Sequence, residues 1–394
     1  MIVPITKTLG RPYIIGFKTD GSVSFWSFSG DEFPSPADLP DTPAYTNDKH
    51  IRLLADTTGS GFYDLVAFTN TDVRVATRNS NENTFNDFAK KIEDFSYDKG
   101  WRVDKHIRYM VDVRNTGRAD IIGFGDTGVF LSKNEPNPEG AGFIFTTPSI
   151  VLNDLCYDKG WRLEKHLRFL GDFYGTGSPD IIGFGETSVF VAKNKGDGTF
   201  EDPQELQGLN QFTFSSGWRV DRHVRTLAHV TSKKYIDIVG FGDEGVYVAV
   251  NKGDGTVESA KLVLEDFGSE KWRVEKHRRI VVDVSGNGLG DIVGFGQAGV
   301  YVSKNRGNGT FEKARLISRD FGYEQGWRID EHPRYMTDVT GNGCADIIGF
   351  KDKKAYVAFN DGEGNFGHAQ SLTDKFSGEG WDKSTCIRYV RRLH

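Results

Sequence analysis

The sequence has few of the features that mark several common protein classes. It has only three cysteines in 394 residues, Cys156, Cys344 and Cys386, and none lies at CxxC spacing. An odd number without that spacing predicts neither a disulfide framework nor a zinc site. No apolar run reaches the ~18 residues that a membrane-spanning helix needs, and the start of the chain lacks the basic and apolar regions of a secretion signal. We therefore expect a soluble protein, either cytoplasmic or secreted by a non-classical route.

The chain also lacks an excess of positive charge. It has 49 Lys and Arg against 55 Asp and Glu, a formal net charge of −6, and basic and acidic side chains are interspersed. A surface that follows nucleic-acid phosphates needs a positive stripe, so nucleic acid is not an expected partner. Nothing in the sequence has the pattern of a long amphipathic helix, whereas 47 glycines indicate many turns.

What the sequence does have is a repeat. Seven segments related to DIIGF end at Phe17, Phe68, Phe124, Phe184, Phe241, Phe295 and Phe350. They recur about every 56 residues and cover nearly the whole chain. Repeats of this length are typical of solenoids, propellers and arrays.

Each repeat contains four short segments with the period-2 pattern of β-strands, for example HRRIVVDV, DIVGFG, GVYVSKN and EKARLISRDFG. Four antiparallel strands per repeat are typical of a propeller blade. Residues 1–45 lack a His-x-Arg strand, and residues 381–393 form such a strand with no DIIGF segment after it. We therefore predict an all-β fold, a seven-bladed β-propeller of four-stranded antiparallel blades, closed by N- and C-terminal strands that share one blade. Residues 1–394 would form this single domain, with residues 381–394 and 10–45 completing the last blade.

A second repeated motif is more specific than a strand or turn requires. GWRVDKHIR, which begins at Gly100, returns as GWRLEKHLR, GWRVDRHVR, KWRVEKHRR and GWRIDEHPR. Its histidine occurs six times, at His50, His106, His166, His223, His277 and His332. The seventh copy has Thr385 instead, so we expect at most six equivalent sites. No second His or Cys lies at ligand spacing, so the histidines are not expected to bind metal.

In the motifs GWRxx(K/R)H, DIxGFG and NxGxGTF, from about residue 10 to residue 394, the sequence closely resembles the Psathyrella velutina lectin family of mushroom β-propeller lectins. The resemblance implies a seven-bladed propeller that binds terminal N-acetylglucosamine, with sialic acid as a mimic, in pockets between consecutive blades. It also implies calcium in the hairpin loops that join the two inner strands of a blade, and no catalysis.

We expect each sugar site to combine a histidine with groups from the same motifs, because hydroxyls need fixed donors and acceptors and the sugar ring needs an aromatic wall. Candidate donors are the arginines Arg102, Arg162, Arg219, Arg273 and Arg328, which could instead pair with the acidic residue two positions on. Candidate stacking aromatics, which could instead pack between blades, are Phe130, Phe190, Tyr247, Tyr301 and Tyr356. Candidate acceptors, which could instead be plain turn residues, are Asp126, Glu186, Asp243 and Gln297.

Other positions in these motifs have a structural explanation. The histidine could simply tie its loop to the backbone, and the tryptophan is expected to wedge between blades. The arginine two residues after each histidine is expected to line the central channel. The His50 repeat departs from the pattern, because Arg74 stands at the aromatic position and AFT replaces GFG. A milder departure is Lys351, which follows GF in a later repeat.

Two loops, DVSGNGLGD and DVTGNGCAD, place oxygen side chains at positions 1, 3, 5 and 9, a spacing that can wrap calcium. The candidate ligands are Asp283, Asn287, Asp291, Asp338, Asn342 and Asp346. A turn in which Asp caps backbone amides explains the same pattern. The corresponding loop with His229, Lys233 and Lys234 is expected to hold no metal.

These patterns favour a multivalent lectin for glycans and glycoproteins that end in N-acetylglucosamine, and the family adds sialic acid as a further ligand. A protein-adhesion propeller of the integrin FG-GAP type is the alternative. An enzyme is less favoured, because an active site draws different residues from different blades, whereas here the notable groups repeat with the fold.

Overall fold

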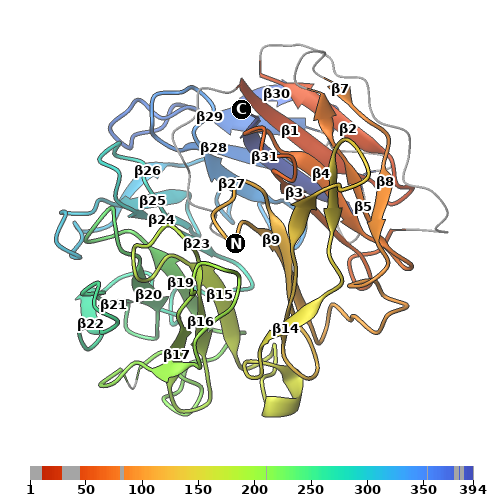
Figure 1. Ribbon diagram of the computed structural model, residues 1–394. Coiled ribbons are helices and arrows are strands. Elements are labelled where there is room, and N and C mark those ends of the chain that lie inside the picture. Colours follow the sequence, from red (N-terminus) through yellow and green to blue (C-terminus); the bar gives the residue numbers. More distant parts are fainter. Residues whose placement is uncertain are drawn as a thin grey trace. The chain divides into compact units, whose positions relative to one another are not determined.

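The computed structural model describes residues 11–28, 45–79, 84–209, 211–352, 354–376, 381 and 386–393. These residues form a seven-bladed β-propeller of mostly four-stranded antiparallel sheets (Figure 1). Among them there is no α-helix, and a single 3₁₀ turn, η1, covers Tyr157–Lys159. The predicted fold class is confirmed.

The chain divides into two compact units. A three-blade unit contains Thr8–Leu163, Lys193–Pro203 and Gly378–His394, and a four-blade unit contains mainly Glu164–Ala192 and Gln204–Ser377.

The three-blade unit contains one three-stranded sheet and two four-stranded sheets. The first joins β2 (Val23–Ser27), β1 (Arg11–Phe17) and β31 (Ile387–Leu393). The second joins β3 (Ile51–Ala55), β4 (Asp64–Phe68), β5 (Val73–Ala76) and β8 (Ala89–Ile92). The third joins β9 (Ile107–Val111), β10 (Asp120–Phe124), β11 (Val129–Ser132) and β14 (Ser149–Leu152). Two small hairpins are formed by β6 (Arg78–Asn79) with β7 (Thr84–Phe85) and by β12 (Asn134–Pro136) with β13 (Phe143–Phe145).

The four-blade unit contains four four-stranded sheets, each in chain order. Its first blade is β15 (Leu167–Gly171), β16 (Asp180–Phe184), β17 (Val189–Ala192) and β18 (Gln204–Glu205). The second is β19 (Val224–Ala228), β20 (Asp237–Phe241), β21 (Val246–Ala249) and β22 (Lys261–Leu264). The third is β23 (Arg278–Val282), β24 (Asp291–Phe295), β25 (Val300–Ser303) and β26 (Arg315–Ser318). The fourth is β27 (Arg334–Thr337), β28 (Asp346–Lys351), β29 (Lys354–Ala358) and β30 (Gln370–Thr373).

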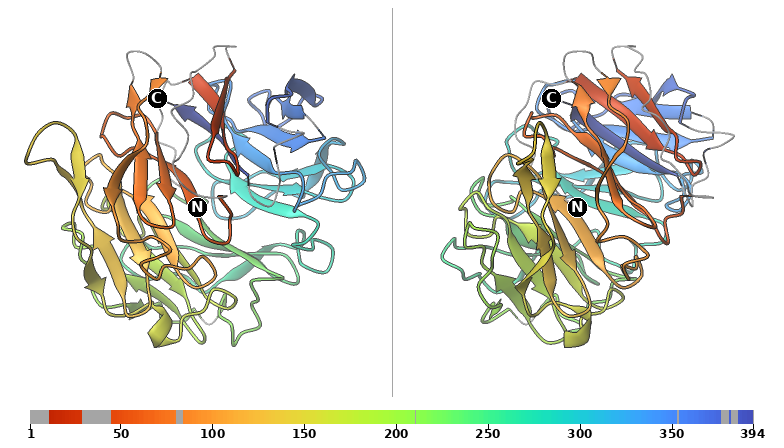
Figure 2. Two further views of the ribbon diagram at one scale, coloured as in Figure 1. Left: turned by 90° about the vertical axis from the view of Figure 1, so that its right-hand side faces the viewer. Right: turned by 45° about the vertical axis from the view of Figure 1, so that its right-hand side comes forward.

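The two ends of the chain share a blade, as predicted. β31 pairs antiparallel with β1, with Val390 opposite Ile14 and Ile387 opposite Phe17. The blue C-terminal strand therefore lies beside the red N-terminal strands (Figure 2). Residues 29–44 of the span predicted to complete this blade lie outside the described residues.

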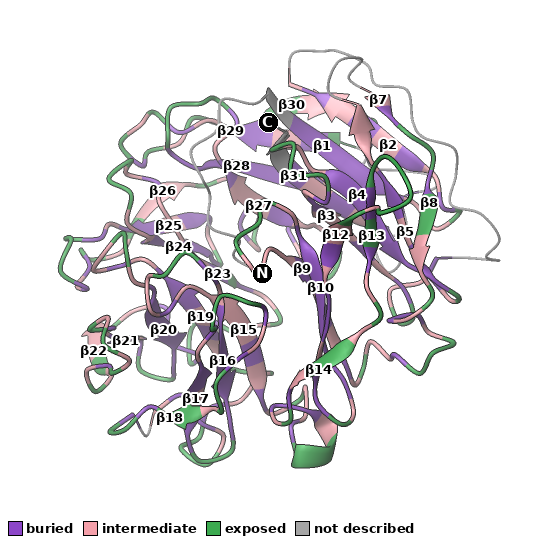
Figure 3. Ribbon diagram, in the orientation of Figure 1, coloured by how far each residue is buried: buried purple, intermediate pink, exposed green. Residues whose placement is uncertain are grey.

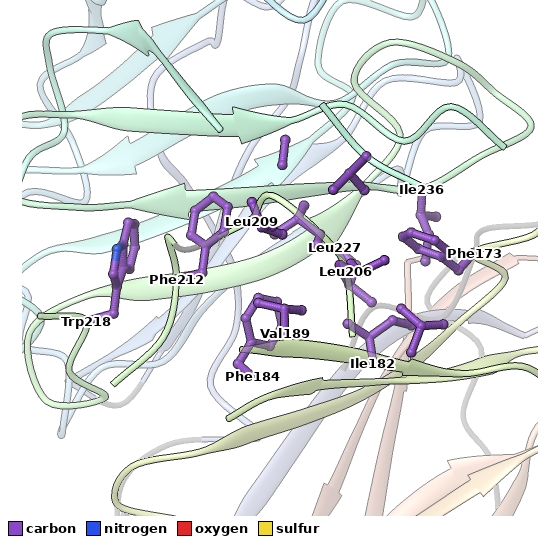
Figure 4. Close-up of a cluster of buried hydrophobic side chains, with 14 residues drawn as sticks. Phe173, Ile182, Phe184, Val189, Leu206, Leu209, Phe212, Trp218, Leu227 and Ile236 are labelled. Atoms are coloured by element: carbon purple, nitrogen blue, oxygen red, sulfur yellow. The ribbon is translucent and has the colours of Figure 1, made fainter. Parts of the chain in front are cut away.

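The second strand of each blade forms the core. In β4, β10, β16, β20 and β24 all five residues are buried (Figure 3), because side chains pack against both faces of these strands. In the four-blade unit, Phe184, Phe212 and Trp218 belong to one apolar cluster with Ile182 and Leu227 (Figure 4).

The motif tryptophan covers a strand glycine. A Cβ atom on Gly240 would lie 2.5 Å from Cη2 of Trp218 and 2.3 Å from Cε1 of Phe212. Trp101 covers Gly123 in the same way, and both tryptophans are 7% exposed. The indole packs between elements of the core, which agrees with its predicted structural role.

The prediction that the arginine two residues after each histidine lines a channel is wrong. Arg108, Arg225 and Arg334 are buried, with at most 3% of the side chain exposed. Each donates a hydrogen bond from Nη1 to the carbonyl of a phenylalanine in the preceding loop, as from Arg108 to Phe95 at 2.7 Å. The guanidinium therefore lies inside the protein, since its donors fix the loop that carries the tryptophan.

Candidate functional site

The motif histidines are held in one protonation state by their own loop. Nδ1 of His223 accepts the backbone amide hydrogen of Arg219 at 3.0 Å, and His106 accepts that of Arg102 at 3.1 Å. Nε2 therefore carries the hydrogen of the neutral imidazole. Burial lowers the pKa of His106, and a carboxylate partner only partly offsets this effect. The ring is thus a neutral donor at Nε2.

The donor faces the residue two positions after the second strand, which the sequence analysis named as a candidate acceptor for sugar hydroxyls. The Nε2 to carboxylate distances are 3.0 Å for His106–Asp126, 3.3 Å for His166–Glu186 and 2.9 Å for His223–Asp243. Each pair brings together two predicted residues that are 20 positions apart in the sequence.

Two clusters have an amide in place of the carboxylate. In the His50 repeat, whose site the sequence put in doubt, Nε2 lies 3.0 Å from Oδ1 of Asn70. In the His277 repeat the position is Gln297, whose Nε2 donates to Glu324 at 3.4 Å. Nε2 of His277 is buried without a hydrogen-bond partner among the described residues.

An aromatic ring that the sequence analysis missed completes these clusters. Tyr157, in the loop before the next tryptophan, donates its amide hydrogen to the carbonyl of Gly125 at 3.1 Å, beside Asp126. Its ring centroid lies 4.0 Å from Nζ of Lys105, and Lys105 also forms an ion pair with Asp126. Histidine, lysine, carboxylate and tyrosine therefore meet at one place. The signal was an aromatic residue four positions before a tryptophan, as in Tyr97, Tyr157, Phe214 and Tyr323.

The same grouping recurs. Nζ of Lys165 lies 4.8 Å from the Phe214 ring centroid, and Nζ of Lys276 lies 4.9 Å from that of Tyr323. In the His50 cluster, Lys49 lies 5.3 Å from Tyr97. The His223 cluster differs, because Ser269 replaces the aromatic residue and Arg222 replaces the lysine. There Arg222 and Ser269 both contact Asp243.

The predicted arginines belong to the cluster of the preceding histidine. The guanidinium of Arg162 lies 3.6 Å from the Tyr157 centroid and donates to the Tyr157 carbonyl at 2.6 Å. Arg102, Arg219 and Arg328 stack in the same way on Tyr97, Phe214 and Tyr323 at 3.7–3.8 Å. Arg273 has no such ring and pairs with Glu275 at 3.1 Å, the alternative that the sequence left open.

The predicted third-strand aromatics are partly exposed, and four of the five contact a motif tryptophan. Phe130 and Tyr247 each contact a tryptophan edge-on, with ring centroids 5.9 Å apart, and Tyr301 and Tyr356 do so at 5.4 and 6.0 Å. Phe190, in β17, is partly buried beside Gly185. At the equivalent place Arg74 pairs with Asp72 at 3.0 Å. These contacts are those of the packing alternative.

The last histidine cluster departs most from the pattern. His332 lies 4.0 Å from Glu331, which replaces the lysine. Lys351 stands where most repeats have the last glycine of GFG, and it donates to the carbonyl of Gln325 at 2.5 Å. Asp352 occupies the acceptor position, and its carboxylate lies 3.8 Å from Nζ of Lys351.

The prediction that Thr385 occupies the seventh histidine position is wrong. Cys386 holds that place, because it lies two residues before Arg388 as His106 lies two residues before Arg108, and its Sγ lies 3.7 Å from Oγ1 of Thr19. Thr385 itself lies outside the described residues.

The oxygens of the two predicted calcium loops satisfy backbone amides. Asp283 accepts hydrogen bonds from the amides of Gly286 and Gly288 at 2.7 and 2.6 Å. Asp291 is fully buried and accepts the amide hydrogens of Val284 and Asn305 at 2.9 and 2.7 Å.

Asp338 and Asp346 make the same contacts in the second loop, and Asn287 and Asn342 each cap an amide two residues on. No group of three or more His, Cys, Asp or Glu in the described part of the chain has the arrangement of a metal site. Calcium stays a prediction of the sequence.

The comparison with solved structures identifies the family. A lectin of Agrocybe aegerita, described as recognising non-reducing terminal N-acetylglucosamine, is 44% identical over 97% of this chain and 95% of its own, with a TM-score of 0.90. A Photorhabdus luminescens Tc holotoxin chain is 12% identical over 90% of this chain and 17% of its own. Its TM-score of 0.48 is too low to support an inference about this protein. No protein-family profile and no curated protein sequence matches the chain. Among the described residues, no helix is long and apolar enough to cross a membrane.

The fold and the recurring polar clusters define a seven-bladed β-propeller with a related histidine cluster in several of its repeats. At 44% identity over nearly its whole length, the chain belongs to the family of mushroom β-propeller lectins that includes the Agrocybe aegerita lectin.

Proposed function

We propose that the protein is a lectin that binds non-reducing terminal N-acetylglucosamine at its histidine clusters. The observation that carries this proposal is the His106 cluster and its repeats. A neutral Nε2–H donor, a carboxylate acceptor, a lysine ammonium group and an aromatic ring converge there. Sugar hydroxyls and an acetamide need this mixture of donors and acceptors, and the apolar faces of the ring need the aromatic side chain.

The neutral state of the histidine favours a neutral sugar. Asp126 and Lys105 compensate each other's charge, so a hydroxyl can accept from the ammonium group and donate to the carboxylate without introducing a charge. The Agrocybe aegerita relative, whose described ligand is this sugar, supports the assignment. Repetition of the cluster supports binding over catalysis, because no single set of residues is distinguished from the others.

The family resemblance adds sialic acid as a second ligand. Among the histidine clusters, that of His277 suits such an acid best, because the uncharged Gln297 stands where other clusters have the carboxylate of Asp126 or Asp243. Lys276 would then be the cation available to the acid, with Glu324 as the competing charge beside Gln297.

A calorimetric titration with N-acetylglucosamine tests the main proposal. We expect several sugars per chain, up to the six histidine clusters. Asp126→Ala should lower the stoichiometry by about one while the protein stays folded, because it removes both carboxylate oxygens of one cluster and leaves the other clusters intact. Glu201→Ala, at an exposed acid away from the clusters, is the matched control. Absence of heat with wild-type protein would contradict the proposal, and full stoichiometry and affinity in Asp126→Ala would contradict the assignment of the acceptor.

A further inference from the structure

The buried arginines of the first strands have donors that the fold leaves unused. Arg108 and Arg225 are each 3% exposed, and each uses Nη1 to bond a phenylalanine carbonyl. Nε and Nη2 of both side chains are buried and have no hydrogen-bond partner among the described residues. Nε of Arg279 and of Arg334 is in the same state. Buried donors are normally paired. Their recurrence without a partner at the equivalent arginine of several blades therefore indicates a functional feature of the repeat and not a local packing fault.

The charge of these arginines is also uncompensated. In the described part of the chain, neither Arg108 nor Arg225 forms an ion pair with a carboxylate, and the charged neighbours that act on them are the cations Arg102 and Arg219. Burial lowers the pKa of both guanidinium groups to about 10, which still leaves them protonated at neutral pH. Phenylalanine rings at 5.6 Å from Arg108 and 5.9 Å from Arg225 supply only a weak cation–π contact.

A buried cation needs a partner that supplies negative charge as well as hydrogen-bond acceptors. Water can accept from Nε and Nη2, but it leaves the charge unpaired. We propose that Arg108 and Arg225 each bind a small inorganic anion of the size of chloride along the edge formed by Nε and Nη2. The ligand has to be small because the guanidinium groups are almost completely enclosed. Arg279 and Arg334, with fewer free donors, bind the same ion more weakly.

These anion sites are distinct from the sugar clusters. Arg108 lies in β9 two residues after His106, on the inner side of the tryptophan, and its Nη1 holds the carbonyl of Phe95. An anion at Arg108 would stabilise the position of Phe95, which packs on Trp101 with ring centroids 4.9 Å apart. The proposal stands whether or not the protein binds sugar.

Anomalous diffraction from crystals grown in bromide instead of chloride locates the ions directly. We expect bromide peaks in contact with both Nε and Nη2 of Arg108 and Arg225. Peaks at exposed arginines only, or uncharged water at the buried ones, would overturn the proposal.

Thermal unfolding in solution separates specific binding from binding at crystal concentration only. At constant ionic strength, replacing gluconate by chloride should raise the melting temperature by about 1–2 °C per tenfold in chloride for each site, because only the folded state binds the ion. Arg225→Met should lose the share of its own site, whereas Arg315→Met, at an exposed arginine in β26, should keep the full chloride response. Arg225→Lys keeps the charge without the two-donor edge and replaces Arg225→Met if that variant does not fold. Equal melting temperatures of wild-type protein in chloride and gluconate would refute the proposal even if bromide peaks were present.

Discussion

At the scale of single residues, the histidines owe their chemistry to one backbone contact. An amide N–H can only donate, so the bonds from Arg219 to His223 and from Arg273 to His277 force Nδ1 to be the acceptor. Protonation of Nδ1 would break this bond and place a charge in a buried site. The pKa of His223 is accordingly lowered from 6.5, mainly by burial, although Asp243 acts in the opposite direction.

The lowered histidine pKa predicts a pH-dependent contribution to stability. Because folded His223 binds a proton less readily than unfolded His223, its contribution is complete above pH 6.5 and is lost as the pH falls through the lowered pKa. Asp64, whose pKa burial raises to about 6, acts in the opposite sense, so the wild-type curve alone is ambiguous. We therefore compare wild type with His223→Gln by urea unfolding between pH 7.5 and 5. The stability lost in the variant should be largest at pH 7.5 and shrink toward pH 5. His368→Gln, at a fully exposed histidine, is the control, and a pH-independent difference for His223→Gln would contradict the lowered pKa of His223.

At the scale of elements, tryptophan and glycine form a matched pair between a loop and a strand. Trp218 covers Gly240, Trp272 covers Gly294 and Trp327 covers Gly349. In the second blade the aromatic residue is Tyr45, and the strand residue is Ala67 instead of glycine. A smaller ring leaves room for a methyl group, which explains why this repeat reads DLVAF.

A methyl group under the larger ring should be destabilising. In Gly123→Ala the new Cβ would lie 2.4 Å from Cη2 of Trp101 and 2.8 Å from Cε1 of Phe95. The rings would have to shift within a packed core, which costs about 1–3 kcal/mol. Gly140→Ala, at a glycine with nothing within 4 Å of the new Cβ, should change stability by less than about 0.5 kcal/mol. Guanidinium unfolding of both variants measures the difference. Equal stabilities would show that the indole does not set the spacing.

The sequence could predict the elements because their signal is periodic. The regular recurrence of segments such as those ending at Phe124 and Phe241 predicted the number of blades. The incomplete first and last repeats predicted that the two ends of the chain share one blade. Asp126 and Asp243, the candidate sugar acceptors, lie beside the motif histidines because they occupy one fixed place after the second strand.

The errors concern residues whose role depends on the neighbouring blade. Tyr157 belongs to the loop that precedes Trp161, and this loop packs on the turn at Gly125 in the preceding blade. The contact between Tyr157 and Lys105 therefore joins two repeats, and the pattern within one repeat does not reveal it. The arginines two residues after the histidines were expected to line the central channel. They are buried instead, because their guanidinium groups donate to carbonyls of the preceding loop, a partner that the pattern of one repeat does not contain.

At the scale of the whole molecule, the repeat places similar clusters at several positions of the chain. The clusters of His50 and His106 lie within the three-blade unit, and those of His166, His223 and His277 lie within the four-blade unit. Each unit therefore carries more than one histidine cluster.

Several clusters on one chain predict a strong dependence on ligand density. On a surface that carries sparse N-acetylglucosamine the protein should bind with the affinity of one cluster, and on a dense surface the apparent affinity should rise by about 10²–10⁴ because later contacts are intramolecular. Surface plasmon resonance at several sugar densities measures this ratio. Combining Asp126→Ala with Asp243→Ala should lower the dense-surface affinity far more than the sparse-surface affinity, because the remaining clusters bind single sugars normally. An apparent affinity that does not change with sugar density would mean that a single cluster accounts for binding and that the other repeats serve only the fold.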